Sequence, residues 1–360
     1  MVPTRDVETW KLLPGVKSGD LGPKIGYNSK DNGWCQFDKV RIPRTNMLMG
    51  LCEVSKEGEL SLKGDPRVMY SVMMGIRMMI VSACGSYFTI QAARNATRYC
   101  CVRRQFKTEQ GSSEERKVID YQTTSTTIAK MLCRGFTMAV AGQFTSHEYE
   151  RMMEDIQRKV FTRMDPMHHI LSGFKAVFSA QALSDVEEAR RTCGGAGYQS
   201  FSGFTALFGA VSPIPTYEGE NNVMIGQASR YLVKQLKRAK EGKTLAFPFT
   251  YLSKMQETLA LKNQARTVED FMDLGVLDRA LQARACNLIN ATMSDYHEST
   301  FSAKFKDNDL FQQAKLSMTV AHMRYLQLHI FRSECEKAAF RDQRITQLMN
   351  LVGKIFCLEQ

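Results

Sequence analysis

The sequence contains few prolines and no cysteine pair with metal-binding spacing. Its 9 prolines are clustered early, which favours long helices from about Asp65 onwards. Its 10 cysteines are irregularly spaced and include no Cys-x-x-Cys motif, a pattern typical of free thiols in a reducing compartment. The adjacent His168 and His169 would point apart on a helix, so no metal site is expected.

The sequence also lacks the apolar core of a secretory signal, because it begins MVPTRDVETW. The most apolar stretch, Met78–Ala93, is too short to span a bilayer and carries Ser, Gly, Thr and Gln. We therefore expect a soluble protein with no membrane span. In such a protein the glycosylation sequons at Asn95 and Asn290 are interpreted as chance matches.

The charge balance is basic, with a net charge of +11 at pH 7. Such a surplus can serve a nucleic acid, an anionic membrane or a polyanionic small molecule. The basic residues are spread along the chain without interleaved aromatic residues or a recognisable nucleic-acid motif. A phosphate-bearing small ligand therefore fits better than DNA or RNA, and a basic helical nucleic-acid binder has only the charge in its favour.

The composition is that of a globular protein rich in helices. Hydrophobic residues make up 44% and charged residues 24%, and the 21 methionines suit helix-packed interiors. Residues 1–50 differ from the rest, because Gly, Pro and Asn separate short strand-like segments at Trp34–Phe37 and Lys39–Ile42. These segments are too few for an independent sheet domain, so we expect a β-domain remnant.

The pattern becomes helical from Asp65. Val68–Tyr99 is apolar on nearly all faces and is predicted to be a buried helix. A second helix is predicted over Val118–Phe144, with the polar His147–Arg158 around its end. A third helix carries an apolar stripe over Leu171–Ala189 and stops at Gly194-Gly195. The glycine-rich stretch that follows, 194–215, is predicted to be a structured loop.

A further helix opens at Glu220, and Gly242–Pro248 marks a domain boundary. Beyond it, Thr267–Asp270 has the spacing of a capping box. Helical stripes then follow over Leu277–Leu288, Leu310–Leu328 and Gln343–Leu358. The predicted fold class is mainly α, with two helical-bundle domains at 51–244 and 245–360 after the β remnant at 1–50.

Three clusters could carry chemistry: Arg103–Phe106, Cys193–Tyr198 and Thr216–Asn221. Arginine forks and glycine turns with free N–H groups are natural partners for a pyrophosphate. In the third cluster, Glu218 lies in a tight turn where Gly219 permits a close backbone approach. Each cluster also has a structural interpretation, since arginines and glycines end helices, and Glu218 and Glu220 could only complement a helix N-terminus.

The order of these clusters resembles the C-terminal half of the acyl-CoA oxidases. The segment LLPGVKSGDLGPKIGYNSKDNGWCQFDKVRIPRTNML (Leu12–Leu48) is similar to the end of their middle β domain. The likeness continues through RRQF, ILSGFKA, CGGAGY and TYEGENNVMIGQASRYLVK, and extends more weakly into the last helical domain.

This resemblance implies FAD-dependent oxidation of acyl-CoA to trans-2-enoyl-CoA with electron transfer to O2 giving H2O2, the first step of peroxisomal fatty acid β-oxidation. Glu218 matches the catalytic base of the family, which takes the proton next to the thioester carbonyl. An apolar pocket can bring the pKa of such a carboxylate towards the working pH. In the family, the backbone N–H of this glutamate also helps polarise the thioester oxygen.

The resemblance implies further ligand contacts, and a homodimer in which some residues reach the flavin of the neighbouring subunit. The residues that match cofactor contacts are Arg103, Phe106, Gly194, Gly195, Glu220 and Asn222. Arg77 matches an arginine near the CoA moiety. A buried arginine needs a partner, so Arg77 either pairs within the protein or holds an anionic ligand.

The sequence also departs from the family pattern. Ala196 replaces the histidine of CGGHGY, and the chain corresponds to a family member truncated at both ends, without most of the flavin-binding part. Its end, Cys357–Gln360, lacks the Ser-Lys-Leu type of signal expected for a peroxisome. The alternative is therefore an inactive oxidase-like protein that serves as a dimerisation or acyl-CoA- or flavin-binding module.

Overall fold

Residues 1–108, 113–262 and 265–360 are described by the computed structural model of the chain. They divide into one unit over Met1–Met74 and another over Gly75–Gln360, and each is described by itself. The fold-class prediction is confirmed, because helices dominate and the strands form only small sheets. The domain boundaries at residues 50 and 244 stay predictions.

The first unit contains two antiparallel hairpins. β1 (Val16–Asp20) pairs with β2 (Gly33–Phe37), and β3 (Cys52–Val54) pairs with β4 (Leu60–Leu62). The prediction of a strand at Lys39–Ile42 is wrong. Lys39 has a φ of 50°, which turns the chain away from the hairpin before the short 3-10 helix η1 (Arg44–Asn46).

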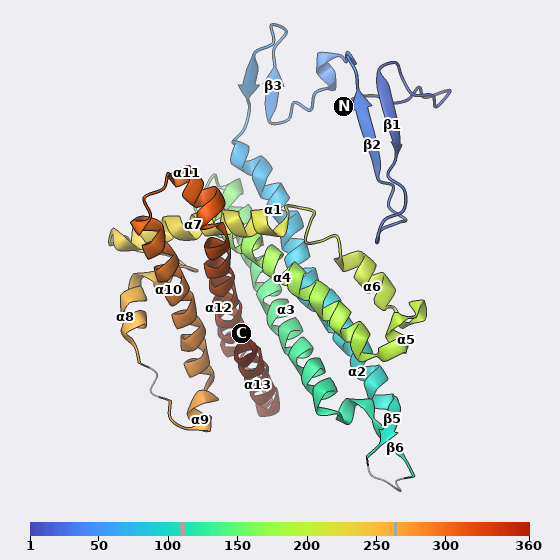
Figure 1. The fold of residues 1–360 in the computed structure, drawn as a ribbon. Coiled ribbons are helices and arrows are strands. Elements are labelled where there is room, and N and C mark those ends of the chain that lie inside the picture. Colours follow the sequence, from blue (N-terminus) through green and yellow to red (C-terminus); the bar gives the residue numbers. More distant parts are fainter. Residues whose placement is uncertain (109–112, 263–264) are drawn as a thin grey trace. The chain divides into compact units, whose positions relative to one another are not determined.

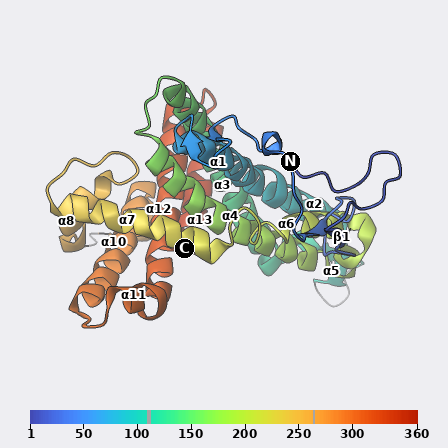
Figure 2. The ribbon, with the colours of Figure 1, turned by 90° about the horizontal axis from the view of Figure 1, so that it is seen from above.

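The second unit is built around long helices that lie side by side (Figure 1). A nearly continuous helical run is formed by α1 (Pro66–Ala83), the π-helical turn η2 (Cys84–Thr89) and α2 (Ile90–Val102). It packs against α3 (Gln122–Gln157) and α4 (Met164–Thr192). α7 (Asn221–Lys240) lies across α4 and α12 (Gln312–Ala338), as Figure 2 shows from above.

The apolar helical run from Arg67 to Val102 is long and apolar enough to cross a membrane by length and composition. The length argument drawn from Met78–Ala93 was therefore wrong, since η2 joins two helices into one run. Packing against α3 indicates a core helix, because a Cβ added at Gly85 would lie 2.5 Å from the Ala139 backbone nitrogen. The outer face is nevertheless open, with Met79 65% exposed, so burial on nearly all faces is not observed.

The helix α3 is longer than predicted. His147–Arg158 was expected around its end, but the helix continues to Gln157. Met152 and Ile156 lie four residues apart and are buried, so this polar stretch still has an apolar face. Beyond the turn, Arg163 pairs with Glu148 and Asp155 and fixes the start of α4.

α4 stops where the sequence predicts it, after Arg190-Arg191 and at Cys193 and Gly194. The following stretch is more regular than the predicted structured loop. It contains the short helices α5 (Gly194–Tyr198), η4 (Ser200–Ser202) and α6 (Phe204–Val211).

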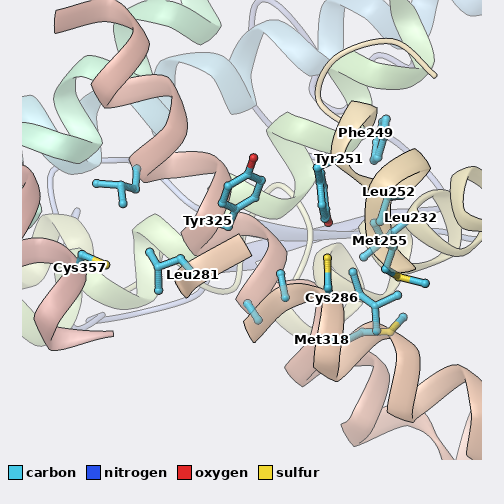
Figure 3. Packing of buried hydrophobic residues seen from close by; sticks show 14 of the residues in the cluster. Leu232, Phe249, Tyr251, Leu252, Met255, Leu281, Cys286, Met318, Tyr325 and Cys357 are labelled. Atoms are coloured by element: carbon cyan, nitrogen blue, oxygen red, sulfur yellow. The ribbon is translucent and has the colours of Figure 1, made fainter. Parts of the chain in front are cut away.

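An apolar core fills the space between α7 and the C-terminal helices (Figure 3). These helices are η5 (Thr250–Lys254), α8 (Met255–Ala260), α10 (Leu274–Glu298), α12 and α13 (Gln343–Glu359), and the short, unburied α9 (Val268–Phe271) precedes α10. The predicted capping box is confirmed, because the Thr267 side chain accepts from the Asp270 backbone N–H and the reciprocal bond is present. The predicted stripe residues Leu277, Leu281 and Ala285 are buried in this core.

Two groups of buried polar side chains, each joined by hydrogen bonds, connect the helices. The guanidinium of Arg134 on α3 pairs with Asp185 on α4 and, through two hydrogen bonds, with Glu359 at the end of α13. A chain of hydrogen bonds also runs from the Ala228 carbonyl through His169 and His322 to the Tyr251 hydroxyl, over distances of 3.0, 3.1 and 2.8 Å. Both groups satisfy polar atoms that would otherwise destabilise the interior.

Candidate active site

The carboxylate of Glu218 is carried by a tight turn that precedes α7. The backbone N–H groups of Thr216 and Tyr217 donate to the Pro213 carbonyl at 3.0 and 3.1 Å. Glu218 then has a φ of 56° and Gly219 a φ of 101°, so two successive residues are left-handed. A non-glycine residue in that region has an unfavourable backbone conformation, which the surrounding contacts must maintain.

Gly219 is required by a close approach as well as by its φ. A Cβ at this position would lie 2.5 Å from the Cε of Met224, whose side chain is buried. Met224 belongs to the apolar stripe of α7, so the turn is packed directly onto the first turn of that helix. The sequence prediction of a close backbone approach at Gly219 agrees with this contact.

Two buried cations hold the turn through its backbone carbonyls. The Arg77 Nε donates to the Glu218 carbonyl oxygen at 3.1 Å. The Lys175 Nζ donates to the Gly219 carbonyl oxygen at 2.6 Å and to the Asn221 Oδ1 at 3.0 Å. Arg77 is 5% exposed and Lys175 is fully buried, so both bonds are shielded from water.

Asn221 connects this group to α4. Its Nδ2 donates to the Ala176 carbonyl and to the Ser179 Oγ, both at 3.0 Å. The α4 segment 175–179 therefore supports the turn through Lys175, Ala176 and Ser179. Arg77 was singled out from the sequence, whereas Lys175 was missed. The signal for Lys175 was available, since a lone lysine interrupts the apolar run ILSGFKA.

Electrostatics around the turn follow from burial. The pKa of Lys175 is lowered to about 8, mainly by burial and to a smaller extent by the Arg77 charge, while Cys84, Glu220 and Glu218 oppose the shift. Burial, with a contribution from Arg77, lowers the pKa of His168 to about 4. At neutral pH the two side chains that donate to the turn are therefore cations, and the His168 imidazole is neutral.

The functional atoms of Glu218 are left available. Among the described residues, no hydrogen bond or ion pair engages its carboxylate, and its backbone N–H has no acceptor. The side chain is half-buried. One turn thus presents a carboxylate, which can take a proton, and an N–H donor, which can bind a nearby oxyanion.

Glu220 has a structural role in this structure. It is the N-cap of α7, and its Oε2 accepts from the backbone N–H groups of Asn222 and Val223 at 2.9 and 3.3 Å. The capping interpretation weighed for Glu220 thus describes its observed contacts. Asn222 is exposed on the first turn of the same helix. The cofactor contacts of both residues stay predictions.

The remaining predicted cofactor residues gather at the other end of α4. Arg103 caps α2, and Phe106, 68% exposed, lies in β5 (Arg104–Lys107), which pairs with β6 (Glu115–Lys117). Gly194 and Gly195 open α5, and a Cβ added at either would meet no atom within 4 Å. The Cys100 Sγ lies 3.8 Å from the Thr192 carbonyl, which brings the ends of α2 and α4 together.

The structure therefore arranges the predicted residues in two clusters rather than one. Lys175 and Thr192 are both on α4, and their sequence separation corresponds to roughly 25 Å along a helix. Figure 1 shows the same separation, with α7 near one end of α4 and with α5 and β5–β6 near the other. Glu218, Glu220 and Arg77 form the first cluster, whereas Arg103, Phe106 and the glycine pair form the second.

Comparison with known proteins gives this arrangement a context. The family model for the acyl-CoA oxidase C-alpha1 domain matches residues 70–233, a range that includes both clusters. Peroxisomal acyl-coenzyme A oxidase 1 of Mus musculus is 29% identical over 366 residues, covering 100% of this chain and 55% of that protein. An acyl-coenzyme A oxidase of Caenorhabditis elegans is 38% identical over 244 residues, covering 68% of this chain and 36% of the relative.

Solved structures agree with the sequence matches. Acyl-CoA oxidase 1 of Arabidopsis thaliana superposes with a TM-score of 0.90 at 29% identity, covering 99% of this chain and 54% of that one. Acyl-CoA oxidase-1 of Caenorhabditis elegans, solved with FAD and ATP, gives a TM-score of 0.78 at 27% identity, covering 98% and 51%. The chain thus spans about half the length of the relatives it matches, and it belongs to the acyl-CoA oxidase family.

Proposed function

We propose that this chain serves the FAD-dependent oxidation of fatty acyl-CoA to trans-2-enoyl-CoA, with O2 reduced to H2O2, in peroxisomal fatty acid β-oxidation. The observation that carries the proposal is the Glu218 turn. It combines a carboxylate and an N–H that bind no other described residue with two buried cations, within the region matched by the family model. The peroxisomal location is inferred from the relatives, which are peroxisomal acyl-coenzyme A oxidases.

Glu218 acts as the general base in this proposal. Its carboxylate takes the proton from the carbon next to the thioester carbonyl, which requires a position within hydrogen-bond reach of that proton. Its own N–H faces no acceptor among the described residues and can donate to the thioester oxygen as negative charge develops there. One left-handed residue therefore supplies both the base and part of the oxyanion stabilisation.

Arg77 and Lys175 act as positioning residues. Each donates to a backbone carbonyl of the turn, at Glu218 and at Gly219, so the two peptide planes that follow the base are held in place. Holding the backbone directly after Glu218 limits the positions that its carboxylate can reach. Arg77 makes a backbone contact, which favours its structural role, and a contact with the CoA moiety stays part of the proposal.

The second cluster fits a phosphate-bearing cofactor. The space beside Gly194 and Gly195 is open, their backbone can approach a pyrophosphate closely, and Arg103 and Phe106 are exposed beside it. When bound, FAD would accept a hydride from the substrate β-carbon and pass the electrons to O2. Because Lys175, which donates to the turn of the base, and Thr192, beside this cluster, lie roughly 25 Å apart along α4, we infer a homodimer in which the cluster holds the flavin used by a second copy.

A second candidate function is an inactive oxidase-like module that dimerises or binds acyl-CoA or flavin. It is favoured by the open glycine turn and the exposed Arg103 and Phe106, which can bind a ligand whether or not Glu218 exchanges a proton. Both candidates use the same two clusters, but only the first requires Glu218 to exchange a proton with substrate. The two are therefore separated by turnover and not by ligand binding.

The test is optical and is made on the purified chain. After incubation with FAD and gel filtration, the oxidase function predicts retained flavin absorbance, bleaching on anaerobic addition of a saturated acyl-CoA, and H2O2 release when oxygen is readmitted. Retained flavin without bleaching or peroxide would support the inactive module. A colourless protein that releases no peroxide would reject the oxidase function for this chain.

A further inference from the structure

Two buried cysteines meet where α2 and α4 end. Cys100 lies on the last turns of α2, and Cys193 is the residue directly after α4. Both are free and buried, whereas the neighbouring Cys101 is exposed. The Cys100 Sγ lies 3.8 Å from the carbonyl of Thr192, the residue before Cys193. The sequence order, with 92 residues between the two cysteines, gave no sign of this pairing.

The two thiols are close enough to influence one another, because the Cys100 Sγ lies against the carbonyl of the residue that precedes Cys193. Interaction with Cys193 lowers the pKa of Cys100, and interaction with Cys100 together with burial raises the pKa of Cys193. The asymmetry makes Cys100 the sulfur that is more readily present as a thiolate. A thiolate with a second thiol beside it is the usual arrangement of a peroxide-responsive pair.

The backbone around Cys193 is firmly held. A Cβ at Gly197 would lie 2.1 Å from the Arg190 carbonyl oxygen and 3.1 Å from the Cys193 Cβ, so α5 packs closely onto the end of α4. The surface is only a residue away, since Gly194, Gly195 and Cys101 are all exposed. A molecule as small as hydrogen peroxide therefore needs only a local opening at these helix ends to reach the pair.

We propose that Cys100 and Cys193 form a peroxide-responsive dithiol that closes to a disulfide. The Cys100 thiolate attacks one oxygen of H2O2, so an S–O bond forms, the O–O bond breaks and the hydroxide released leaves as water after taking up a proton. The Cys193 sulfur then attacks the Cys100 sulfur, forming the S–S bond, and the second hydroxide leaves as water with the Cys193 proton. Two thiols are oxidised by two electrons, and one H2O2 is reduced to two H2O.

The disulfide would tie together the two elements of the second cluster. Arg103 lies three residues after Cys100, and Gly194 directly follows Cys193. Oxidation would thus fix the arginine and the glycine turn relative to one another. If H2O2 is the product of this chain, the disulfide would be a feedback of that product on the second cluster, and this interpretation rests on the proposed oxidase function. The formation of the disulfide itself does not depend on that function.

The test uses the full chain and added H2O2, so that it is independent of any activity. The protein is fully reduced, freed of reductant, treated with one equivalent of H2O2, blocked with N-ethylmaleimide and digested without reduction. Mass spectrometry should find a peptide pair joining Cys100 to Cys193, lighter by about 2 Da than the two free peptides because two hydrogens have left. The pair should disappear after treatment with dithiothreitol.

Cys101 provides the matched control, because it adjoins Cys100 and is exposed. Cys101→Ser should keep the linked peptide, and Cys100→Ser and Cys193→Ser should each lose it. The proposal is overturned if the wild-type chain yields no linked pair while exposed Cys35 or Cys101 is oxidised. It is equally overturned if the link persists in Cys100→Ser but is lost in Cys101→Ser. The wild-type peptide map decides the matter even where a variant fails to fold.

Discussion

At the scale of single residues, the position of the proposed base depends on the contacts that hold the Glu218 turn. Lys175 is the least expected member, because a fully buried ammonium is costly unless its hydrogen bonds are made. Its two acceptors, the Gly219 carbonyl and the Asn221 Oδ1, are themselves in the turn and its helix. The lysine thereby couples the conformation of the Glu218 turn to α4.

Lys175→Met should destabilise the protein by about 1–3 kcal/mol, because a buried carbonyl and a buried amide lose their donor. Chemical denaturation measures this change, with Lys237→Met on the exposed face of α7 as the control.

The pKa of Lys175 is lowered from 10.5 to about 8, so the unfolded chain binds more protons between these values. Wild-type stability should therefore gain from this residue as pH rises from about 8 to 10.5, and the variant should lack that gain. Identical pH profiles would contradict the assignment.

Gly219→Ala tests the close approach in the turn. The new methyl group would lie 2.5 Å from the Met224 Cε at a φ of 101°, so we expect a loss of about 1–3 kcal/mol and a displaced turn. Gly226→Ala on α7 is the matched control, since a Cβ there meets no atom within 4 Å. It should stabilise the helix by about 0.5–1 kcal/mol. Equal effects of the two changes on the midpoint of unfolding would refute the packing argument.

The sequence predicted the residues of the turn better than the residues that support it. Glu218 and Gly219 were found because a carboxylate between prolines and a helix start is a local pattern. Lys175 was missed because nearly every residue of the segment 169–179 is buried, so no helical periodicity distinguishes its faces. Its partners lie 44 and 46 residues away in the chain, and only the tertiary structure brings them together.

At the scale of elements, the hydrogen-bond chain through His169 and His322 connects α4, α7, α12 and η5. Because the Ala228 carbonyl can only accept, the His169 Nδ1 donates and its Nε2 accepts from the His322 Nε2. The His322 Nδ1 then accepts from the Tyr251 hydroxyl. This direction of donation requires both imidazoles to be neutral, and a proton added to either one would break a link.

Acid should therefore loosen this junction. Burial lowers the pKa of His322 to about 3 and holds that of His169 well below its usual range, near 6.5. Between about pH 6.5 and 3 the unfolded chain binds more protons, so stability should fall as pH falls through this window. In denaturation curves, His322→Gln should reduce the slope in this window, whereas His297→Gln, at an exposed position, should not. An unchanged slope in His322→Gln would show that His322 does not control acid unfolding.

Apolar stripes predicted the positions of the helices. The wrong predictions lie where a stripe ends or where apolar and polar residues share one face. The stripe around Leu277 and the capping box at Thr267 predicted α9 and α10 well. The end of α3 was placed too early, because its last turns keep only Met152 and Ile156 as a buried face. The run at Lys39–Ile42 alternates like a strand but has no partner strand beside it.

At the scale of the whole molecule, the main consequence is the distance between the two clusters in the second unit. A base near one end of α4 and an open glycine turn near the other suit two copies that exchange flavin contacts. The predicted dimer can be measured by light scattering with and without FAD. A chain that is monomeric in both states would contradict the inferred exchange of flavin contacts between copies.

The central claim is that Glu218 is the base, and the most direct measurement is H2O2 release by three FAD-treated proteins: wild type, Glu218→Gln and Glu220→Gln. Loss of a general base predicts that Glu218→Gln falls by roughly 10²–10⁴-fold while its flavin absorbance is retained. Glu220→Gln, compared per bound flavin because Glu220 is also a predicted cofactor contact, should keep its turnover within a few-fold and lose only about 1 kcal/mol of stability as a weakened helix cap. Wild-type turnover in the flavin-loaded Glu218→Gln variant would contradict the account.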